Sequence, residues 1–319
     1  MAGLCGKTVL LLGAGKEQIA AIQAARGLGL RVVAADGSLK APGLALADRG
    51  VNIDIRDVEA VYRVAKSEHA DGIFCHAVEL PQVVAEVTQR LKLPGLDPGV
   101  ADRATNKLLR YQCFQANQIP CPRFRLACNL EEAFSHAKQL GFPVVMKPID
   151  NAGARGVRKV AGLDEVEAGF RWVLQSSRES MVLIEEFLEG LEISTESIVV
   201  DGQIITTGFA DRNYDKKQTY APYFIEDGHT IPTALSAGDH AKVLSVVERA
   251  IRALGIDWGV AKGDVILHAE GPKVFEMAAR TSGGRFCSDM VPLATGVNIL
   301  IPLISLALGE KVPLEDFTP

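Results

Sequence analysis

The sequence predicts an α/β protein whose C-terminal half has α+β character. Up to residue 98, short apolar runs alternate with segments of helical periodicity, which indicates βαβ units and a parallel sheet. In the C-terminal half, β-branched runs follow one another closely, and the Asp201-Gly202 pair between two of them is a strong hairpin signal. The length, 319 residues, is sufficient for two domains or more.

The first expected domain, residues 1–98, is a βαβ domain. Its strands are short apolar runs, the second of which ends at Asp36, and its closing segment, residues 94–99, is dense in turn-forming residues. Strands and helices are expected to alternate over residues 8–12, 18–28, 31–35, 58–65 and 72–75.

The second expected domain, residues 99–319, begins with a helix and then mixes strands and helices. Its last long helix is amphipathic, because Val243, Val247 and Ile251 recur on one side. The expected helices cover residues 102–117, 131–140, 164–175 and 241–254. The expected strands cover residues 143–147, 181–185, 193–200 and 203–210, with a hairpin over residues 263–277.

The composition argues against nucleic acid, membranes and zinc as partners. The net charge is −5 and no basic run is present. The longest apolar stretch, residues 297–308, is interrupted and falls short of the ~20 residues that span a bilayer. The six cysteines form no C-x-x-C pair and the histidines are scattered, so we expect reduced thiols. The start of the chain lacks a secretory pattern, which predicts a cytoplasmic protein.

The hairpin over residues 263–277 places two acidic residues opposite each other. With a loop over residues 269–271, the register pairs Asp264 with Glu276. At the ~4.5–5.5 Å between the Cβ atoms of such a pair, two carboxylates repel unless one is protonated or a cation lies between them. Hard oxygen ligands at this separation suit Mg²⁺ bound together with phosphates. The alternative is two solvated carboxylates on an open face.

A lysine and a glycine-containing loop form a second candidate site. Lys147 ends an apolar strand, and residues 151–157 follow with Gly153 and Gly156. An ammonium group and several backbone N–H groups can together bind phosphate oxygens. The alternative, which the local pattern favours on its own, is an ordinary turn beside a lysine whose stem packs on apolar surface.

A third candidate site lies at residues 184–192, a strand that runs into an acidic connector. The edge of a strand can hydrogen-bond an adenine, and a carboxylate a few residues later can accept from ribose hydroxyls. The alternative is a set of acidic residues that face only water.

A glycine pair near the N-terminus raises a dinucleotide-binding alternative. Gly13 and Gly15 follow the first strand, and Asp36 ends the second. The third position of the glycine pattern is Gln18, where a small residue would let the helix and strand approach. The match is weak, and an NAD(P)-dependent oxidoreductase is a rival interpretation.

Taken together and in order, these motifs resemble the ATP-grasp superfamily. The resemblance covers essentially the whole chain, including a βαβ domain before the grasp domain. Its closest form is the carbamoyl-phosphate-synthase-like and L-amino-acid-ligase branch. The motifs that carry it are Lys107, Lys147-Pro148, the Gly153/Gly156 loop, Glu185-Glu186-Phe187-Leu188 with Glu192, Asp264, and Glu276-Met277-Ala278-Ala279-Arg280 followed by Gly283-Gly284.

The resemblance implies a role for each of these residues. Lys107 and Lys147 are expected to contact ATP phosphates, and Asp264 and Glu276 to hold Mg²⁺, or Mn²⁺ in its place. Arg280 is expected to steady the transferred phosphoryl group, which suits a permanently charged bidentate donor. The other expected ATP contacts are Gly153, Arg155 and Gly156 in a mobile lid, Glu185, Glu186, Phe187 and Leu188 at the adenine, and Glu192 at the ribose.

The resemblance also implies a two-lobed grasp domain and a reaction. The lid lobe is expected at about residues 122–182 and the metal-binding lobe at about residues 183–319. The implied enzyme is a carboxylate–amine ligase that forms an amide or peptide-like bond through an acyl phosphate and releases ADP and phosphate. Many relatives have Asn two residues after the metal-binding Glu, where this chain has Ala278. This departure leaves an ATP-binding regulatory protein with little turnover as the alternative function.

Residues that select the small-molecule carboxylate and amine are harder to assign. Glu79 lies at the carboxyl edge of the first sheet, where it would hold an ammonium group or be a solvated loop acid. Arg285 is a candidate for a substrate carboxylate, and His229 lies in a stretch that resembles the acceptor site of related ligases. Relatives often continue into a further small domain, so we expect its contacts to be absent or to come from another subunit. A homodimer is one candidate assembly.

Overall fold

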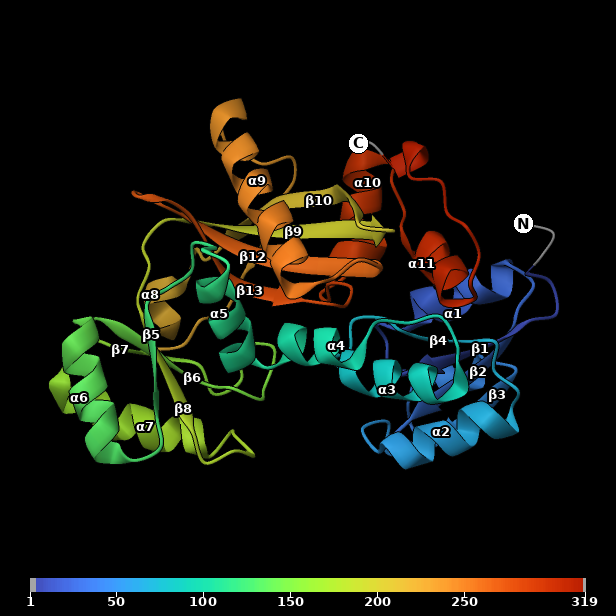
Figure 1. Ribbon diagram of the computed structural model, residues 1–319, viewed down its shortest axis with the longest axis horizontal. Helices are drawn as coiled ribbons and strands as arrows, with labels where there is room; N and C mark the ends of the chain where they lie inside the picture. Colours follow the sequence, from blue (N-terminus) through green and yellow to red (C-terminus); the bar gives the residue numbers. More distant parts are fainter. Residues whose placement is uncertain (1–3, 318–319) are drawn as a thin grey trace.

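The computed structural model describes residues 4–317, which form three sheets with helices packed around them (Figure 1). The first sheet is parallel and the other two are antiparallel. This architecture confirms the predicted α/β class with an α+β C-terminal half. The expected domain ranges also include residues 1–3 and 318–319, which lie outside the described residues. The division at residue 98 remains a proposal.

The first sheet is buried on both faces along β1, β2 and β4, as the apolar strands predict, whereas its edge strand β3 is largely exposed. Its order is β3-β2-β1-β4. Within β1, Val9 and Leu11 join a different apolar cluster from Leu10 and Leu12, because successive side chains point to opposite faces. The strands are β1 (Thr8–Leu12), β2 (Arg31–Asp36), β3 (Arg49–Asn52) and β4 (Gly72–Cys75). The helices are α1 (Ile19–Gly27), α2 (Val58–Ser67) and α3 (Pro81–Leu91), with a 3₁₀ turn η1 (Pro42–Ala45).

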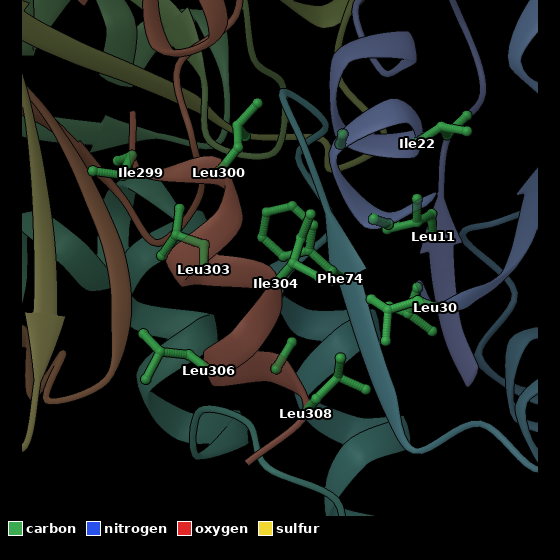
Figure 2. Packing of buried hydrophobic residues seen from close by; sticks show 14 of the residues in the cluster. Leu11, Ile22, Leu30, Phe74, Ile299, Leu300, Leu303, Ile304, Leu306 and Leu308 are labelled. Atoms are coloured by element: carbon green, nitrogen blue, oxygen red, sulfur yellow. The ribbon is translucent and has the colours of Figure 1, made fainter. Parts of the chain in front are cut away.

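The C-terminal helix α11 (Leu300–Ala307) packs on the first sheet, far from it in sequence (Figure 1). Figure 2 shows Leu303 and Ile304 of this helix beside Phe74 of β4. The same cluster includes Ile198 and Val260 from the third sheet. Helix α11 therefore ties the N-terminal sheet to the third sheet, which the sequence pattern did not predict.

The second sheet has the order β5-β8-β6-β7 and is covered on one face by two helices. Ala133 and Ala137 of α6 and Phe170 of α7 form its core with Met146 and Ile184. The elements are β5 (Phe124–Ala127), α6 (Leu130–Leu140), β6 (Val144–Pro148), β7 (Arg158–Val160), η2 (Leu163–Glu165), α7 (Val166–Leu174) and β8 (Val182–Glu186).

The third sheet has the order β11-β10-β9-β12-β13 and packs against the long helix α9. The predicted turn at Asp201 and Gly202 joins β9 to β10. Ser236 caps α9, which begins a turn earlier than predicted. The elements are β9 (Leu191–Val200), β10 (Gln203–Asn213), α8 (Lys217–Tyr220), β11 (Gly228–Thr230), α9 (Ala237–Leu254), β12 (Gly259–His268) and β13 (Gly271–Ala278). They are followed by η3 (Phe286–Met290), α10 (Val291–Thr295), α11 and η4 (Glu315–Phe317).

The helix predicted over residues 102–117 is two helices, α4 (Pro98–Thr105) and α5 (Lys107–Ala116). Asn106 separates them, because its side chain accepts from the amides of Leu108 and Leu109 at 2.9 and 3.1 Å. This cap starts α5 at Lys107. The prediction of one continuous helix was wrong, because it overlooked a strong N-capping residue inside the apolar pattern.

The predicted pairing of Asp264 with Glu276 is present, although the loop that led to it is not. The turn contains two residues, so His268 pairs with Gly271 and Val265 with Val274. An irregularity in the register between Asp264 and Val265 restores the expected pair. The predicted loop over residues 269–271 was therefore wrong by one position, and the bulge compensates for it.

Across residues 4–317, no helix combines the length and apolar content that a bilayer span requires.

We expect the packing of α11 to contribute strongly to stability. Leu303 is 2% exposed in the cluster of Figure 2, so Leu303→Ala should lower the free energy of unfolding by about 2–5 kcal/mol. The matched control is Leu293→Ala, because Leu293 is 87% exposed and its truncation should change stability by less than about 0.5 kcal/mol. Urea unfolding measures both variants. Equal effects would contradict the packing described for α11.

Candidate active site

A cavity of about 820 Å³ lies between the second and third sheets. All the predicted ATP contacts line it, together with Glu276 and Arg280. They come from α5, the end of β6, the loop after β6, the end of β8 and the residues just after it, the start of β9, and the β12–β13 hairpin with the residues just after it. The structure therefore brings most of the predicted site residues together in one cavity, although in the sequence they are spread over most of the second expected domain.

Two buried cations in this cavity have no carboxylate partner among the described residues. Lys107, at the start of α5, is 8% exposed and donates to the backbone carbonyl of Asn151. Arg110 is 2% exposed. Its Nη1 atom donates to the carbonyls of Ala104 and Met277 at 3.0 and 2.9 Å, whereas its Nε and Nη2 atoms make no hydrogen bond within residues 4–317. Burial, and next the charge of Arg110, lower the pKa of Lys107 from 10.5 to about 8. An anion bound in the cavity would offset the positive charge of both side chains.

Lys147 is positioned by a buried network that the sequence did not predict. Its Nζ atom lies 2.7 Å from Glu185 Oε2 and donates to the hydroxyl of Tyr111 at 3.0 Å. The Tyr111 hydroxyl also lies 2.7 Å from Glu185 Oε2 and 3.0 Å from the carbonyl oxygen of Phe275. The carboxylate of Glu185 is thus committed to Lys147 and Tyr111 rather than free at the cavity wall.

A signal for Tyr111 and Arg110 was present in the sequence. Lys107, Arg110, Tyr111 and Phe114 are the buried residues of α5 and follow the i, i+3, i+4, i+7 spacing of one helix face. Charged residues on an otherwise apolar face of a helix indicate a polar site beneath it. Sequence reasoning singled out Lys107 alone.

The loop after β6 approaches the cavity with left-handed backbone. Gly153, Ala154 and Gly156 have φ values of 65°, 57° and 76°. A Cβ atom at Gly156 would lie 2.6 Å from Cβ of Ser176, so this position requires glycine. The Asn151 side chain anchors the start of the loop by donating to the carbonyl of Ser176 at 2.8 Å. Arg155 is exposed at its tip and donates to Asn151 Oδ1 at 3.1 Å.

The end of β8 forms a wall of the cavity beside the hairpin. The Glu186 carboxylate pairs with Arg123 at 2.6 Å and Lys273 at 3.3 Å, so its side chain is largely satisfied. Phe187 packs near Phe224, with ring centroids 6.3 Å apart, and both line the cavity with Leu188. This wall is apolar and aromatic, and Lys159 Nζ lies over the Phe187 ring, 3.8 Å from its centroid.

The two hairpin carboxylates lie in very different environments. Asp264 is fully buried, accepts from Ser194 Oγ at 3.0 Å and lies 2.8 Å from Arg212 Nη1. Glu276 is 24% exposed and lines the cavity. Lys262, which sequence reasoning missed, lies between them and pairs with both.

The charge around Glu276 keeps it ionised. Burial favours its neutral form, but the positive charges of Lys262, Arg110 and Lys107 outweigh burial and hold its pKa well below the usual range. Glu192, also predicted at the cavity, lies 4.0 Å from Arg212, and burial raises its pKa. Arg212 thus faces several carboxylates on this side of the cavity.

The donor set fits Mg²⁺ bound jointly with a nucleotide. Within residues 4–317, no cluster of three or more His, Cys, Asp or Glu side chains could hold a metal alone. Mg²⁺ is normally held by one or two carboxylates plus substrate phosphates and water, and Glu276 at the cavity wall meets that requirement.

Of the three residues predicted to contact substrate, Glu79 is connected to the cavity, and His229 and Arg285 are not. Glu79 forms an ion pair with Arg280, so the N-terminal sheet contributes to the cavity through its contact with the predicted catalytic arginine. His229 lies behind the cavity, 3.4 Å from Ser194 Oγ, and burial lowers its pKa. Arg285 is exposed and pairs with Asp289 at 2.6 Å. Neither His229 nor Arg285 lines the cavity, and their substrate roles remain predictions.

The N-terminal glycine pair is occupied by the protein's own side chains. Asp36 Oδ2 accepts from the amide of Ala14 at 2.8 Å, and Gln18 donates to the carbonyl of His76 at 2.8 Å. A Cβ atom at Gly15 would lie 2.9 Å from Gln18 Oε1. Gln18 therefore fills the space over this turn, which weakens the dinucleotide-binding interpretation.

The comparison with protein families assigns the chain to a known family. The model of the ATP-grasp domain matches residues 104–284, more than half of the chain. The chain belongs to the ATP-grasp family, as the sequence motifs predicted. The matched residues include α5, the second sheet and the hairpin, which together enclose the cavity.

The relatives and structural neighbours agree with this class. An uncharacterized protein, y4rH, from Sinorhizobium fredii is 28% identical over 306 residues, which are 92% of this chain and 62% of the relative. A D-alanine–D-alanine ligase from Delftia acidovorans is 29% identical over 239 residues, 72% of this chain and 71% of the relative. The crystal structure of L-amino acid ligase from Bacillus licheniformis superposes with a TM-score of 0.80 at 24% identity, covering 95% of this chain and 74% of that one. The chain thus spans less than two thirds of y4rH.

We expect the Tyr111 hydroxyl to stabilise the buried network. Tyr111→Phe leaves Lys147 and Glu185 short of a partner and should lower the free energy of unfolding by about 1–3 kcal/mol. Tyr62→Phe is the matched control, because Tyr62 is only partly buried and the substitution keeps the ring that packs beneath Arg90. Chemical unfolding compares the two. The same small effect in both variants would show that the network contributes nothing.

Proposed function

We propose that the chain is an ATP- and Mg²⁺-dependent carboxylate–amine ligase that forms an amide or peptide-like bond through an acyl phosphate. The observation that carries the proposal is the burial of Lys107 and Arg110 without a carboxylate partner, in the cavity that also holds Lys147 and Glu276. Such a cavity suits a polyanion that brings its own divalent cation. The ATP-grasp match and the ligases among its relatives support the same class.

In this proposal the purine and ribose of the nucleotide contact one set of cavity residues, and its phosphates contact another. The purine ring lies on the apolar wall formed by Phe187 and Leu188, and Glu192 accepts from the ribose. Lys107 and Lys147 contact the phosphates, while the amides of the loop after β6 close over them.

Glu276 holds Mg²⁺ together with phosphate oxygens. When bound, Mg²⁺ neutralises charge on the phosphates and orients them for transfer. The pKa of Glu276 stays low enough for the carboxylate to remain ionised, which is the form that binds a cation.

The protein contributes positioning and charge rather than a covalent intermediate. The substrate carboxylate attacks the γ-phosphorus and forms the acyl phosphate with release of ADP, and the amine then displaces phosphate. Arg280, fixed by Glu79, faces the cavity and stabilises charge on the transferred group. The proposal places this reaction in the cytoplasm and includes a homodimer as its candidate assembly.

A regulatory ATP-binding protein with little turnover is the second candidate. The observation that favours it is Lys262, which already pairs with both hairpin carboxylates, beside Ala278 rather than a further oxygen ligand. This candidate predicts nucleotide binding without product formation over a broad panel of acids and amines.

A product assay tests the ligase proposal. The purified chain with Mg-ATP and pooled acids and amines should release ADP and phosphate only when both substrate types are present, with weak ADP formation from the acid alone. Lys147→Met should lower kcat/KM by about 10²-fold or more, because it removes a cation at the phosphates. The exposed-lysine control, Lys138→Met, should retain activity. Release of AMP and pyrophosphate would contradict the proposal.

The pH dependence of nucleotide binding tests the role of Lys107. Its pKa of about 8 means that the ammonium is present below pH 8 and is lost as the pH rises above that value. The Kd of a non-hydrolysable ATP analogue should therefore rise by up to about tenfold per pH unit above pH 8. Lys107→Arg stays charged and should give a flat profile. Calorimetric titration from pH 7 to 9.5 measures both, and a wild-type profile as flat as that of Lys107→Arg would show that proton loss from Lys107 does not weaken nucleotide binding over this range.

A further inference from the structure

The structure places a lysine ammonium between the two carboxylates for which the sequence predicts a metal ion. Lys262 pairs with Asp264, and its Nζ atom lies 3.4 Å from Glu276 Oε2. Lys262 precedes Asp264 by two residues on β12, so both side chains extend from the same face of the third sheet. The backbone register, and not only a flexible stem, directs the ammonium to this point.

The residue across the ladder from Lys262 leaves room for this arrangement. It is Ala278 on β13, next to the pair formed by Asp264 and Glu276. Its methyl group fills little space and supplies no oxygen ligand, so the Lys262 side chain can turn along the sheet toward both carboxylates. At this point of the sheet, Ala278 supplies no oxygen ligand for a metal, and Lys262 supplies a positive charge.

Asp264 has little capacity left for a metal. Oδ1 accepts from Ser194, and Oδ2 faces both Arg212 and Lys262. Of these two positive groups, only Lys262 also reaches Glu276, so its ammonium lies where a cation shared by the two carboxylates would bind. Glu276 differs, because it faces the cavity and Lys262 is its one ion-pair partner within residues 4–317.

We propose that the site binds one divalent cation per nucleotide, through Glu276, and that the Lys262 ammonium takes the place of a second cation between Asp264 and Glu276. Lys262 lines the cavity, so its charge also faces the bound phosphates. The inference rests on the proposed function, because the cation binds together with ATP. The inference also explains Ala278. Its side chain has no oxygen ligand because, in this proposal, the Lys262 ammonium supplies the positive charge and no second metal ion has to be bound.

Counting bound Mn²⁺ tests this inference without measuring activity. The full-length chain is equilibrated with Mn²⁺ and a non-hydrolysable ATP analogue, and bound Mn²⁺ is quantified by dialysis and by electron paramagnetic resonance. The wild type should bind one Mn²⁺ per chain with the spectrum of an isolated ion. Lys262→Met should bind two, with the broadened signal of a coupled pair, whereas Lys262→Arg keeps the charge and should bind one.

Two further variants test whether Glu276 is the residue that binds the cation. Glu276→Gln should lose the bound Mn²⁺, and Glu270→Gln should keep it, because Glu270 lies 73% exposed in the turn of the same hairpin. Two Mn²⁺ per wild-type chain, or one in a folded Lys262→Met that binds the analogue, would overturn the inference alone. Failure of the wild type to bind the analogue under any condition would instead overturn the proposed function.

Discussion

The excess of buried positive charge at Lys107 and Arg110 is the constraint on which the rest of the site depends. Burying a charge without a partner is costly, and such groups persist in proteins where a ligand supplies the opposite charge. Other buried cations of the cavity have carboxylate partners, such as Glu185 for Lys147 and Glu79 for Arg280. The unpaired charge therefore selects a polyanion, and the paired cations hold fixed positions around it.

The positions of these charged side chains depend on how several separate helices and strands pack against one another. Lys107 starts α5, Lys147 ends β6 and Glu276 lies on β13, so the cavity exists only when the second and third sheets face each other across α5. The N-terminal sheet takes part through the ion pair of Glu79 with Arg280, and α11 holds that sheet against the third one (Figure 1, Figure 2). Packing far from the cavity thus controls where Arg280 points.

Much of the fold was predictable because apolar periodicity decides which residues are buried. The βαβ alternation and the Asp201 turn follow from local pattern. The pairing of Asp264 with Glu276 was also predicted, but it is present only because a bulge compensates for the misplaced loop. The expectation that Lys107 and Lys147 share one site came from the resemblance to the ATP-grasp superfamily, and both residues line the cavity. Contacts set by long-range packing were not predictable. Helix α11 looked like an interrupted apolar run, β3 is largely exposed and lacks a strand pattern, and the position of Lys262 depends on a bulge that no local signal announces.

A crystal structure of the full-length chain with Mg²⁺ and a non-hydrolysable ATP analogue tests the central claim most directly. The account predicts the phosphates against Lys107 and Lys147, the purine beside Phe187 and Leu188, and the divalent cation on Glu276. A nucleotide bound at the N-terminal Gly13 and Gly15 turn, or phosphates that leave Lys107 without an anion, would contradict it.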